Sequence, residues 1–206
     1  MPDALLLDWE GCIVDTSAMR QLAAQRALRD EGLPPETAAT MDPVIAGLLA
    51  ARTSRAFAER LGKGFAVREG VREFLEQAQL SARIAIVTQA TRAETEFVLR
   101  LAGLESIIST VVSADDEPDA LPSARPFIAA IAQLSKRRAT RPDQCIAIGT
   151  SADAIRSART AALRTIALGA PAHVAVEADG AVDSLVGLSM SALARTAGLP
   201  VTEHSA

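Results

Sequence analysis

The chain has 206 residues, of which 49% are hydrophobic and 22% charged, and its formal net charge is −4 at pH 7. This composition excludes a disordered chain, and the length allows one domain with a large core and an insertion. The negative charge argues against a nucleic-acid partner. The sequence shows neither a positively charged leader nor a long apolar run, so we expect neither secretion nor a membrane span. We therefore expect a cytoplasmic protein whose two cysteines, Cys12 and Cys145, are buried free thiols.

The first expected element is a short buried strand that ends in an acidic residue. Residues 4–8 read Ala-Leu-Leu-Leu-Asp, an apolar run typical of a strand in a parallel sheet. Such sheets place their chemistry at the carboxyl ends of the strands. Asp8 at that end, with Glu10 two residues later, can serve as a nucleophile with an acid/base partner. The alternative is an aspartate that only caps the next turn.

A helical pattern follows over residues 17–64. Apolar residues recur at helical spacing in residues 17–31, Pro34-Pro35 is expected to begin a second helix, and residues 52–61 form a third. We expect an all-helical insertion within an α/β core. The predicted domains are a core of residues 1–16 and 65–206 and a helical insertion of residues 17–64.

The rest of the chain alternates strands with amphipathic helices, which predicts a doubly wound parallel sheet of the α/β class. Hydroxyl residues stand at or just after the ends of two of the later strands. Thr88, followed by Gln89, ends one strand, and Thr150 follows another that ends at Gly149. The expected strands lie near Leu5, Ile84, Val111, Ile146 and Thr165.

The stretch from Asp8 to Thr16 resembles the first motif of the haloacid dehalogenase-like hydrolase superfamily, Asp-x-Asp-Gly-x-x-x-Asp-Thr, with Glu10 in place of the second acid. The resemblance extends from about Ala4 to Ala194 and is closest to the branch of β-phosphoglucomutase and phosphoglycolate phosphatase. It implies a Rossmann-like core in which Asp8 attacks a phosphoryl group, Glu10 is the general acid/base and Mg²⁺ assists.

The resemblance also implies that the helical insertion is a cap that closes over the site and selects the substrate. Residues 51–55, Ala-Arg-Thr-Ser-Arg, are similar to the substrate-specificity loop of the family. Arg55 is our preferred contact for an anionic substrate group, because a guanidinium can bind such a group with two hydrogen bonds. Arg52 and Arg55 could equally be solvated charges at the start of a helix.

The second motif of the family matches and the third is altered. Thr88 stands where a Ser or Thr holds a phosphoryl oxygen, and Gln89 beside it is expected to contact the substrate. The third motif is a lysine before a helix, and its position falls on Leu121 by one alignment and on Arg125 by another. We take Arg125 as the catalytic cation, because phosphoryl transfer requires positive charge near the oxygens.

The fourth motif is altered where the family binds its metal. Residues 149–155 are similar to Gly-Asp-Ser-x-x-Asp-Ile, but Thr150 replaces the metal-binding Asp and Asp153 comes one position early. Mg²⁺ is usually bound by one or two carboxylates in octahedral geometry. The expected ligands are Asp8, the Glu10 carbonyl, Thr150 and Asp153, and together they predict a weak Mg²⁺ site or none.

Three functions are compatible with these motifs. The first is hydrolysis of a small phosphorylated metabolite through an aspartyl-phosphate on Asp8. The second is a binding or regulatory protein that retains the fold without catalysis. The third is a metal-independent dehalogenase, against which Glu10 argues, because dehalogenases resembling this fold carry no acid there. Both a monomer and a homodimer are compatible with the sequence.

Overall fold

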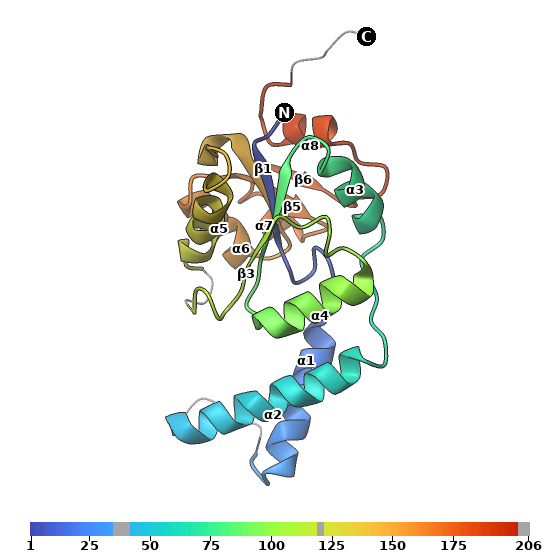
Figure 1. Cartoon of the computed structure of the whole chain (residues 1–206), viewed down its shortest axis with the longest axis vertical. Coiled ribbons are helices and arrows are strands. Elements are labelled where there is room, and N and C mark those ends of the chain that lie inside the picture. The colour runs from blue at the N-terminus through green and yellow to red at the C-terminus, as the bar shows by residue number, and fades with distance from the viewer. Residues whose placement is uncertain (35–41, 119–121, 202–206) are drawn as a thin grey trace. The chain divides into compact units, whose positions relative to one another are not determined.

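The computed structural model describes residues 1–34, 42–118 and 122–201 (Figure 1). Contacts divide the chain into two compact units. The core unit is Met1–Val14 with Val67–Ala206, and the helical unit is Asp15–Ala66. The predicted insertion, residues 17–64, lies within the helical unit, and its action as a cap stays a prediction.

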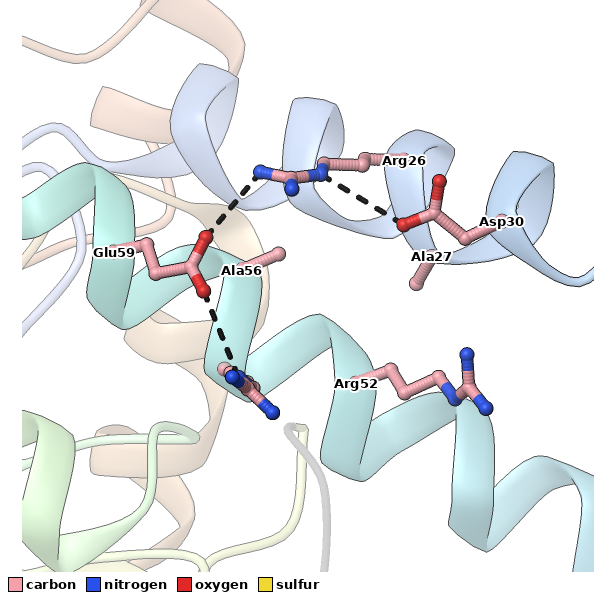
Figure 2. A pocket seen from close by; sticks show the side chains of 7 residues that line it. Arg26, Ala27, Asp30, Arg52, Ala56 and Glu59 are labelled. Atoms are coloured by element: carbon pink, nitrogen blue, oxygen red, sulfur yellow. Dashed lines mark hydrogen bonds and ion pairs between the residues drawn. The ribbon is translucent and has the colours of Figure 1, made fainter.

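The helical unit contains α1 (Ser17–Asp30) and α2 (Pro43–Leu61). Ala27 of α1 and Ala56 of α2 are buried where the two helices face each other (Figure 2), and the Arg20 guanidinium lies 4.1 Å from the centroid of the Phe57 ring. The expected helix start at residue 52 is wrong. The side chain of Asp42 accepts a hydrogen bond from the Val44 amide at 2.9 Å and begins α2 nine residues earlier, at Pro43.

The other helix expected in this unit, beginning at Pro34-Pro35, falls mainly outside the described residues. In the described ranges, no helix combines the length and apolar character needed to cross a membrane.

The core unit is built on a six-stranded parallel sheet with the strand order β3-β2-β1-β4-β5-β6. The strand β1 (Ala4–Asp8) lies in the middle, where Leu5 pairs with Ile84 of β2 and with Ile146 of β4 (Figure 1). The predicted α/β doubly wound sheet is therefore confirmed. The other strands are β2 (Arg83–Val87), β3 (Thr110–Val112), β4 (Cys145–Gly149), β5 (Arg164–Leu168) and β6 (Gly180–Val182).

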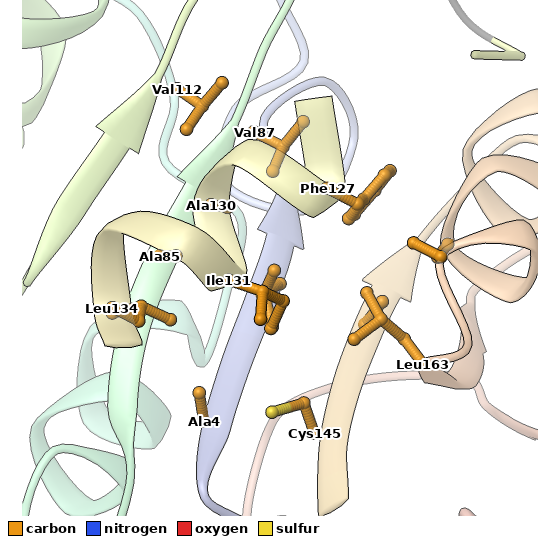
Figure 3. Close-up of a cluster of buried hydrophobic side chains, with 14 residues drawn as sticks. Ala4, Ala85, Val87, Val112, Phe127, Ala130, Ile131, Leu134, Cys145 and Leu163 are labelled. Carbon is orange, nitrogen blue, oxygen red and sulfur yellow. The ribbon is translucent and has the colours of Figure 1, made fainter. Parts of the chain in front are cut away.

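Helices cover the sheet because both faces of its central strands are apolar. On one face, Phe127 and Ile131 of α5 pack over Ala85 and Val87 of β2 (Figure 3). Leu5 and its alternate neighbours are buried on the other face, where α3 contacts β2 and α8. The helices of the core unit are α3 (Val71–Ala78), α4 (Arg92–Ala102), α5 (Arg125–Ser135), α6 (Ala152–Thr160), α7 (Ala172–Ala175) and α8 (Met190–Thr196), with a 3₁₀ turn at Pro142–Gln144.

The core unit is continuous at the point where the helical unit interrupts its sequence. Val14 and Val67 form an antiparallel bridge, and the amide of Arg68 donates to the carbonyl of Ile13 at 2.8 Å. The chain therefore leaves and re-enters the core unit at adjacent positions. Cys12 and Cys145 are both buried and free, as expected.

Candidate functional site

Asp8 lies at the carboxyl end of β1, between the ends of β2 and β4. All five residues of β1 are buried, and Asp8 itself is only 8% exposed. The chain then turns at Gly11, whose φ of +76° favours glycine and whose amide donates to the Val14 carbonyl at 2.8 Å. The fold thus places a carboxyl group, with almost no exposure to solvent, at the edge where parallel sheets carry out chemistry.

Burial raises the pKa of Asp8 to about 7, and the negative charge of Glu10 contributes to the rise. Hydrogen bonds with the backbone of Trp9 and Glu10 act in the opposite direction and lower the pKa. A carboxyl group with a pKa near 7 exchanges its proton readily at neutral pH. Strongly shifted pKa values of this kind are frequent at functional sites.

The strand next to β1 brings Thr88 to the same edge of the sheet. Asp8 pairs in register with Val87, and Thr88 follows directly. Thr88 is buried, its hydroxyl oxygen accepts a hydrogen bond from the Ala90 amide at 3.0 Å, and its own amide donates to the Val112 carbonyl at 2.9 Å. Gln89, the next residue, is exposed in the turn after the strand.

Arg125 is the first residue of α5, and its side chain is 65% exposed. Its Nε lies 3.3 Å from Oε2 of Glu117, so the guanidinium forms an ion pair on the surface of the core unit. Leu121, the alternative at this position, lies outside the described residues. The action of Arg125 on a phosphoryl group stays a prediction.

Thr150 follows β4 and contacts the loop after β1. Its hydroxyl donates a hydrogen bond to the carbonyl of Glu10 at 3.1 Å. The same hydroxyl lies against Gly11, since a β-carbon on that glycine would be 2.5 Å from Oγ1. Thr150 and the Glu10 carbonyl, two of the expected metal ligands, are thus bonded directly to each other, and their binding of Mg²⁺ stays a prediction.

Asp153, the remaining expected metal ligand, lies on the surface of α6. Its carboxylate is 3.1 Å from the Arg156 guanidinium, and both side chains are 54% exposed. Within the described ranges, no three His, Cys, Asp or Glu side chains lie close enough together to hold a metal ion, so Asp153 does not join Asp8 and Glu10. These residues do not fit the set of oxygen ligands that Mg²⁺ requires in proteins.

Arg68 is a cation at this edge of the sheet that the sequence analysis missed. Its guanidinium donates to the carbonyl of Gly11, and its Nη2 occupies the space where a β-carbon on Gly169 would stand. Burial raises the pKa of the Cys12 thiol well above its ordinary value, the charge of Asp8 raises it further, and the charge of Arg68 lowers it. Cys12 is therefore within electrostatic reach of both charges. A hydrogen bond to a distant backbone carbonyl leaves no local pattern in the sequence.

A pocket of about 450 Å³ lies within the helical unit, between α1 and α2 (Figure 2). Arg55 borders it with its side chain 85% exposed and pairs with Glu59 at 3.6 Å. Arg26 bridges Glu59 at 3.3 Å and Asp30 at 3.7 Å. The lining residues are Arg26, Ala27, Asp30, Arg52, Arg55, Ala56 and Glu59.

Several solved structures share this fold. CbbY from Rhodobacter sphaeroides, solved with xylulose-(1,5)bisphosphate and separately with phosphate, is 19% identical, with a TM-score of 0.80 over 94% of this chain and 99% of CbbY. β-Phosphoglucomutase from Clostridium difficile is 14% identical, with a TM-score of 0.82 over 96% of this chain and 98% of that one.

A predicted phosphoglycolate phosphatase from Haemophilus somnus is 17% identical, with a TM-score of 0.75 over 89% of this chain and 94% of that one. At these identities the likeness concerns the fold. No curated protein sequence matches the chain. The family model described as haloacid dehalogenase-like hydrolase matches residues 5–168, which include β2 to β5 and all of β1 except Ala4. Sequence and fold agree, and the chain belongs to the haloacid dehalogenase-like hydrolase family.

Proposed function

We propose that this protein hydrolyses a phosphomonoester of a small metabolite, with Asp8 as the nucleophile. The observation that carries the proposal is the burial of Asp8 at the carboxyl end of the central strand, beside Glu10 and in register with the strand that leads to Thr88. Burying a carboxyl group destabilises the folded protein, and the fold could form without it. A chemical role is therefore the better explanation for the burial of Asp8. The names of the similar structures, which include a predicted phosphatase, a phosphomutase and a bound bisphosphate, support the same class of substrate.

The proposed reaction has two steps. A carboxylate oxygen of Asp8 attacks phosphorus, the bond to the leaving oxygen breaks, and Glu10, which must take up a proton before this step, gives that proton to the leaving oxygen. Glu10, now a carboxylate, then takes a proton from a water that attacks the aspartyl-phosphate, which releases phosphate and regenerates Asp8. The Thr88 hydroxyl donates a hydrogen bond to a phosphoryl oxygen and stabilises the charge that develops there.

Two arginines are proposed to supply positive charge. Arg125 would contact the phosphoryl group, and Arg55 would bind another anionic group of the substrate. Both form ion pairs in the structure, Arg125 with the mostly buried Glu117 and Arg55 with the exposed Glu59. An exposed pair contributes about 0 to 1 kcal/mol, so exchanging the Glu59 carboxylate for a phosphate oxygen costs Arg55 little. The role of Gln89 beside the substrate stays part of this proposal.

The test is release of inorganic phosphate from a panel of phosphomonoesters by the wild type and by Asp8→Asn. We expect turnover of at least one compound by the wild type and a loss of about 10³-fold or more in the variant, since the nucleophile is gone. Asp143→Asn is the matched control, because Asp143 lies in the 3₁₀ turn before the amino end of β4, at the opposite edge of the sheet. Equal turnover by Asp8→Asn and the wild type would show that Asp8 is not the nucleophile.

The second candidate is a binding or regulatory protein without catalysis. It is favoured by the side chains that replace the altered motifs, since Thr150 bonds to the Glu10 carbonyl and Asp153 pairs with Arg156. This candidate predicts that phosphorylated metabolites bind and that none of them is hydrolysed. A dehalogenase is disfavoured by the acid at Glu10.

A further inference from the structure

Two successive carbonyls in the loop after β1 each accept a hydrogen bond from a distant side chain. The carbonyl of Glu10 accepts from the hydroxyl of Thr150, which is 140 positions away in the sequence. The carbonyl of Gly11 accepts from the guanidinium of Arg68, which is 57 positions away. We call this pair of donors the loop clamp. The loop that follows the nucleophile is therefore held from two sides by residues of the core unit.

The first donor stands where the family motif has a carboxylate. Thr150 brings no negative charge, and its hydroxyl proton is already directed at the Glu10 carbonyl. A neutral hydroxyl bound to a carbonyl leaves Mg²⁺ without the carboxylate oxygen it prefers. Asp153 does not replace that carboxylate, because it pairs with Arg156 on the exposed side of α6.

The second donor brings positive charge to the same loop. Arg68 is half-buried, and it is held in place by its own backbone, since its amide donates to the Ile13 carbonyl at 2.8 Å. Its guanidinium is the charged group that contacts the loop. A cation on the Gly11 carbonyl opposes the approach of a second, divalent cation to the neighbouring Glu10 carbonyl.

We propose that the loop clamp takes the place of a divalent cation, so that Mg²⁺ is not bound at Asp8 and the phosphorylated ligand is taken without it. As a statement about catalysis this rests on the proposed function. As a statement about cation binding it holds for an active or an inactive protein. The loop after β1 is organised by the clamp before any ligand arrives.

The test is a titration of Mn²⁺, as a spectroscopic substitute for Mg²⁺, into the full chain, followed by electron paramagnetic resonance, together with thermal unfolding in Mg²⁺ or in NaCl of equal ionic strength. The wild type is expected to show no saturable Mn²⁺ binding and no rise in Tm specific to Mg²⁺. Thr150→Asp places a carboxylate against the Glu10 carbonyl and Gly11 and is expected to bind Mn²⁺ at least tenfold more tightly than the wild type, with a Tm that rises with Mg²⁺.

Two control variants test whether Mn²⁺ binding requires a carboxylate at position 150 or only an additional negative charge nearby. Ser151→Asp adds a carboxylate one residue later, where Ser151 caps α6 by accepting from the Ala154 amide at 3.2 Å, a role that an aspartate can fill. It is expected to gain no Mn²⁺ binding. Thr150→Ser keeps the hydroxyl and is expected to behave as the wild type.

Saturable Mn²⁺ binding by the wild type that Asp8→Asn abolishes would overturn the proposal. A folded Thr150→Asp protein with no gain would overturn it as well, and the wild-type titration decides alone if that variant does not fold. Hydrolysis that stops in EDTA and returns with Mg²⁺ would contradict this inference and leave the proposed function intact. Absence of hydrolysis, with the expected cation results, would contradict only the proposed function.

Discussion

The side chain of Thr150 lies directly against Gly11, so that a β-carbon on the glycine would stand 2.5 Å from Oγ1 and 2.9 Å from Cγ2 of the threonine. Thr150 is β-branched and short, so it has few ways to move aside. Gly11→Ala is therefore expected to combine this clash with the strain of a φ of +76° and to lose about 2 to 4 kcal/mol of stability in urea unfolding.

Gly187→Ala is the matched control for this change. Gly187 has a φ of +67°, and a β-carbon added to it would meet no atom within 4 Å, so only the backbone strain of about 1 to 2 kcal/mol is expected. Equal losses for the two variants would show that Thr150 yields to a side chain at Gly11.

Asp8 is expected to destabilise the folded protein at neutral and alkaline pH. Burial raises its pKa from 3.8 to about 7, so between these values the folded protein binds more protons at this group than the unfolded chain does. The contribution of Asp8 to the free energy of unfolding is therefore most favourable below about pH 4 and falls as the pH rises to about 7. Asp8→Asn removes the effect and is expected to be more stable than the wild type above pH 7, by roughly 2 to 4 kcal/mol.

Urea unfolding of the wild type and Asp8→Asn at several pH values between about 4 and 8 checks this prediction. The difference between the two proteins should shrink as the pH falls, and Asp143→Asn should show no such trend. A constant difference across this range would mean that burial does not raise the pKa of Asp8.

The ion pair of Arg92 with Asp116 is expected to make the stability of the protein fall as the pH is lowered, the opposite of the effect of Asp8. Burial raises the pKa of Asp116, but hydrogen bonds from Arg92 at 2.7 and 2.8 Å and from Ser113 outweigh it, and the pKa lies below 3.8. A lowered pKa in the folded state stabilises the protein above the unfolded pKa, and this stability is lost as the pH falls through the folded value.

Asp116→Asn is expected to cost about 1 to 2 kcal/mol at pH 7 and to reduce the loss of wild-type stability below about pH 4. Thermal unfolding as a function of pH measures both effects. Glu105→Gln removes a more exposed acid, whose oxygen is 3.8 Å from Arg100, and should change neither. If Asp116→Asn lost stability below pH 4 as steeply as the wild type does, the pair of Arg92 and Asp116 would be excluded as the cause of that loss.

Arg83 stabilises the carboxyl end of α5. Its guanidinium donates to the carbonyls of Leu134 at 2.6 Å and Arg138 at 3.0 Å, and to the Thr140 hydroxyl at 2.7 Å. Carbonyls at a helix end have no partner within the helix, and a cation there is favourable. Arg83→Met is expected to lose about 2 kcal/mol, and Arg83→Lys to recover only part, because an ammonium cannot reproduce the planar fork.

The measurement for Arg83 is the urea midpoint, with Arg137→Met as the control, because Arg137 is an exposed side chain of the same charge near the same helix end. Full recovery in Arg83→Lys would show that charge alone stabilises this helix end.

Arg55 offers a test of substrate recognition that is separate from stability. Its side chain is 85% exposed, so Arg55→Ala should change unfolding by less than about 0.5 kcal/mol. If Arg55 binds an anionic group of the substrate, KM should rise about tenfold or more with kcat unchanged. Arg100→Ala, which removes another exposed arginine, is the control. An unchanged KM would exclude Arg55 from the substrate site.

The sheet and the position of Asp8 could be predicted from the sequence because they depend on local patterns. An apolar run buried on both faces, such as Leu5 to Leu7, is a strong strand signal, and the end of a parallel strand fixes where the next residue lies. The pairing of Asp153 with Arg156 also has a local basis, since residues three apart share one side of a helix.

Other features depend on contacts that no local pattern records. The donation from Arg68 to the Gly11 carbonyl joins segments on opposite sides of the helical unit in the sequence, and an arginine in a linker has no distinctive spacing. The hydrogen bond from Thr150 to Glu10 likewise depends on β1 and β4 being neighbours. The start of α2 was missed for a different reason, because Asp42-Pro43 is a local cap signal that the apolar pattern overshadowed.

The bridge between Val14 and Val67 has a consequence for how this chain can vary. The segments around Val14 and Val67 already pair with each other, so a short turn would be enough to connect them. The helical unit is inserted at the position of that turn. The entropy of closing such a loop grows only slowly with its length. Segments of quite different size could therefore be exchanged at this junction during evolution, or by design, while the sheet and its register stay unchanged.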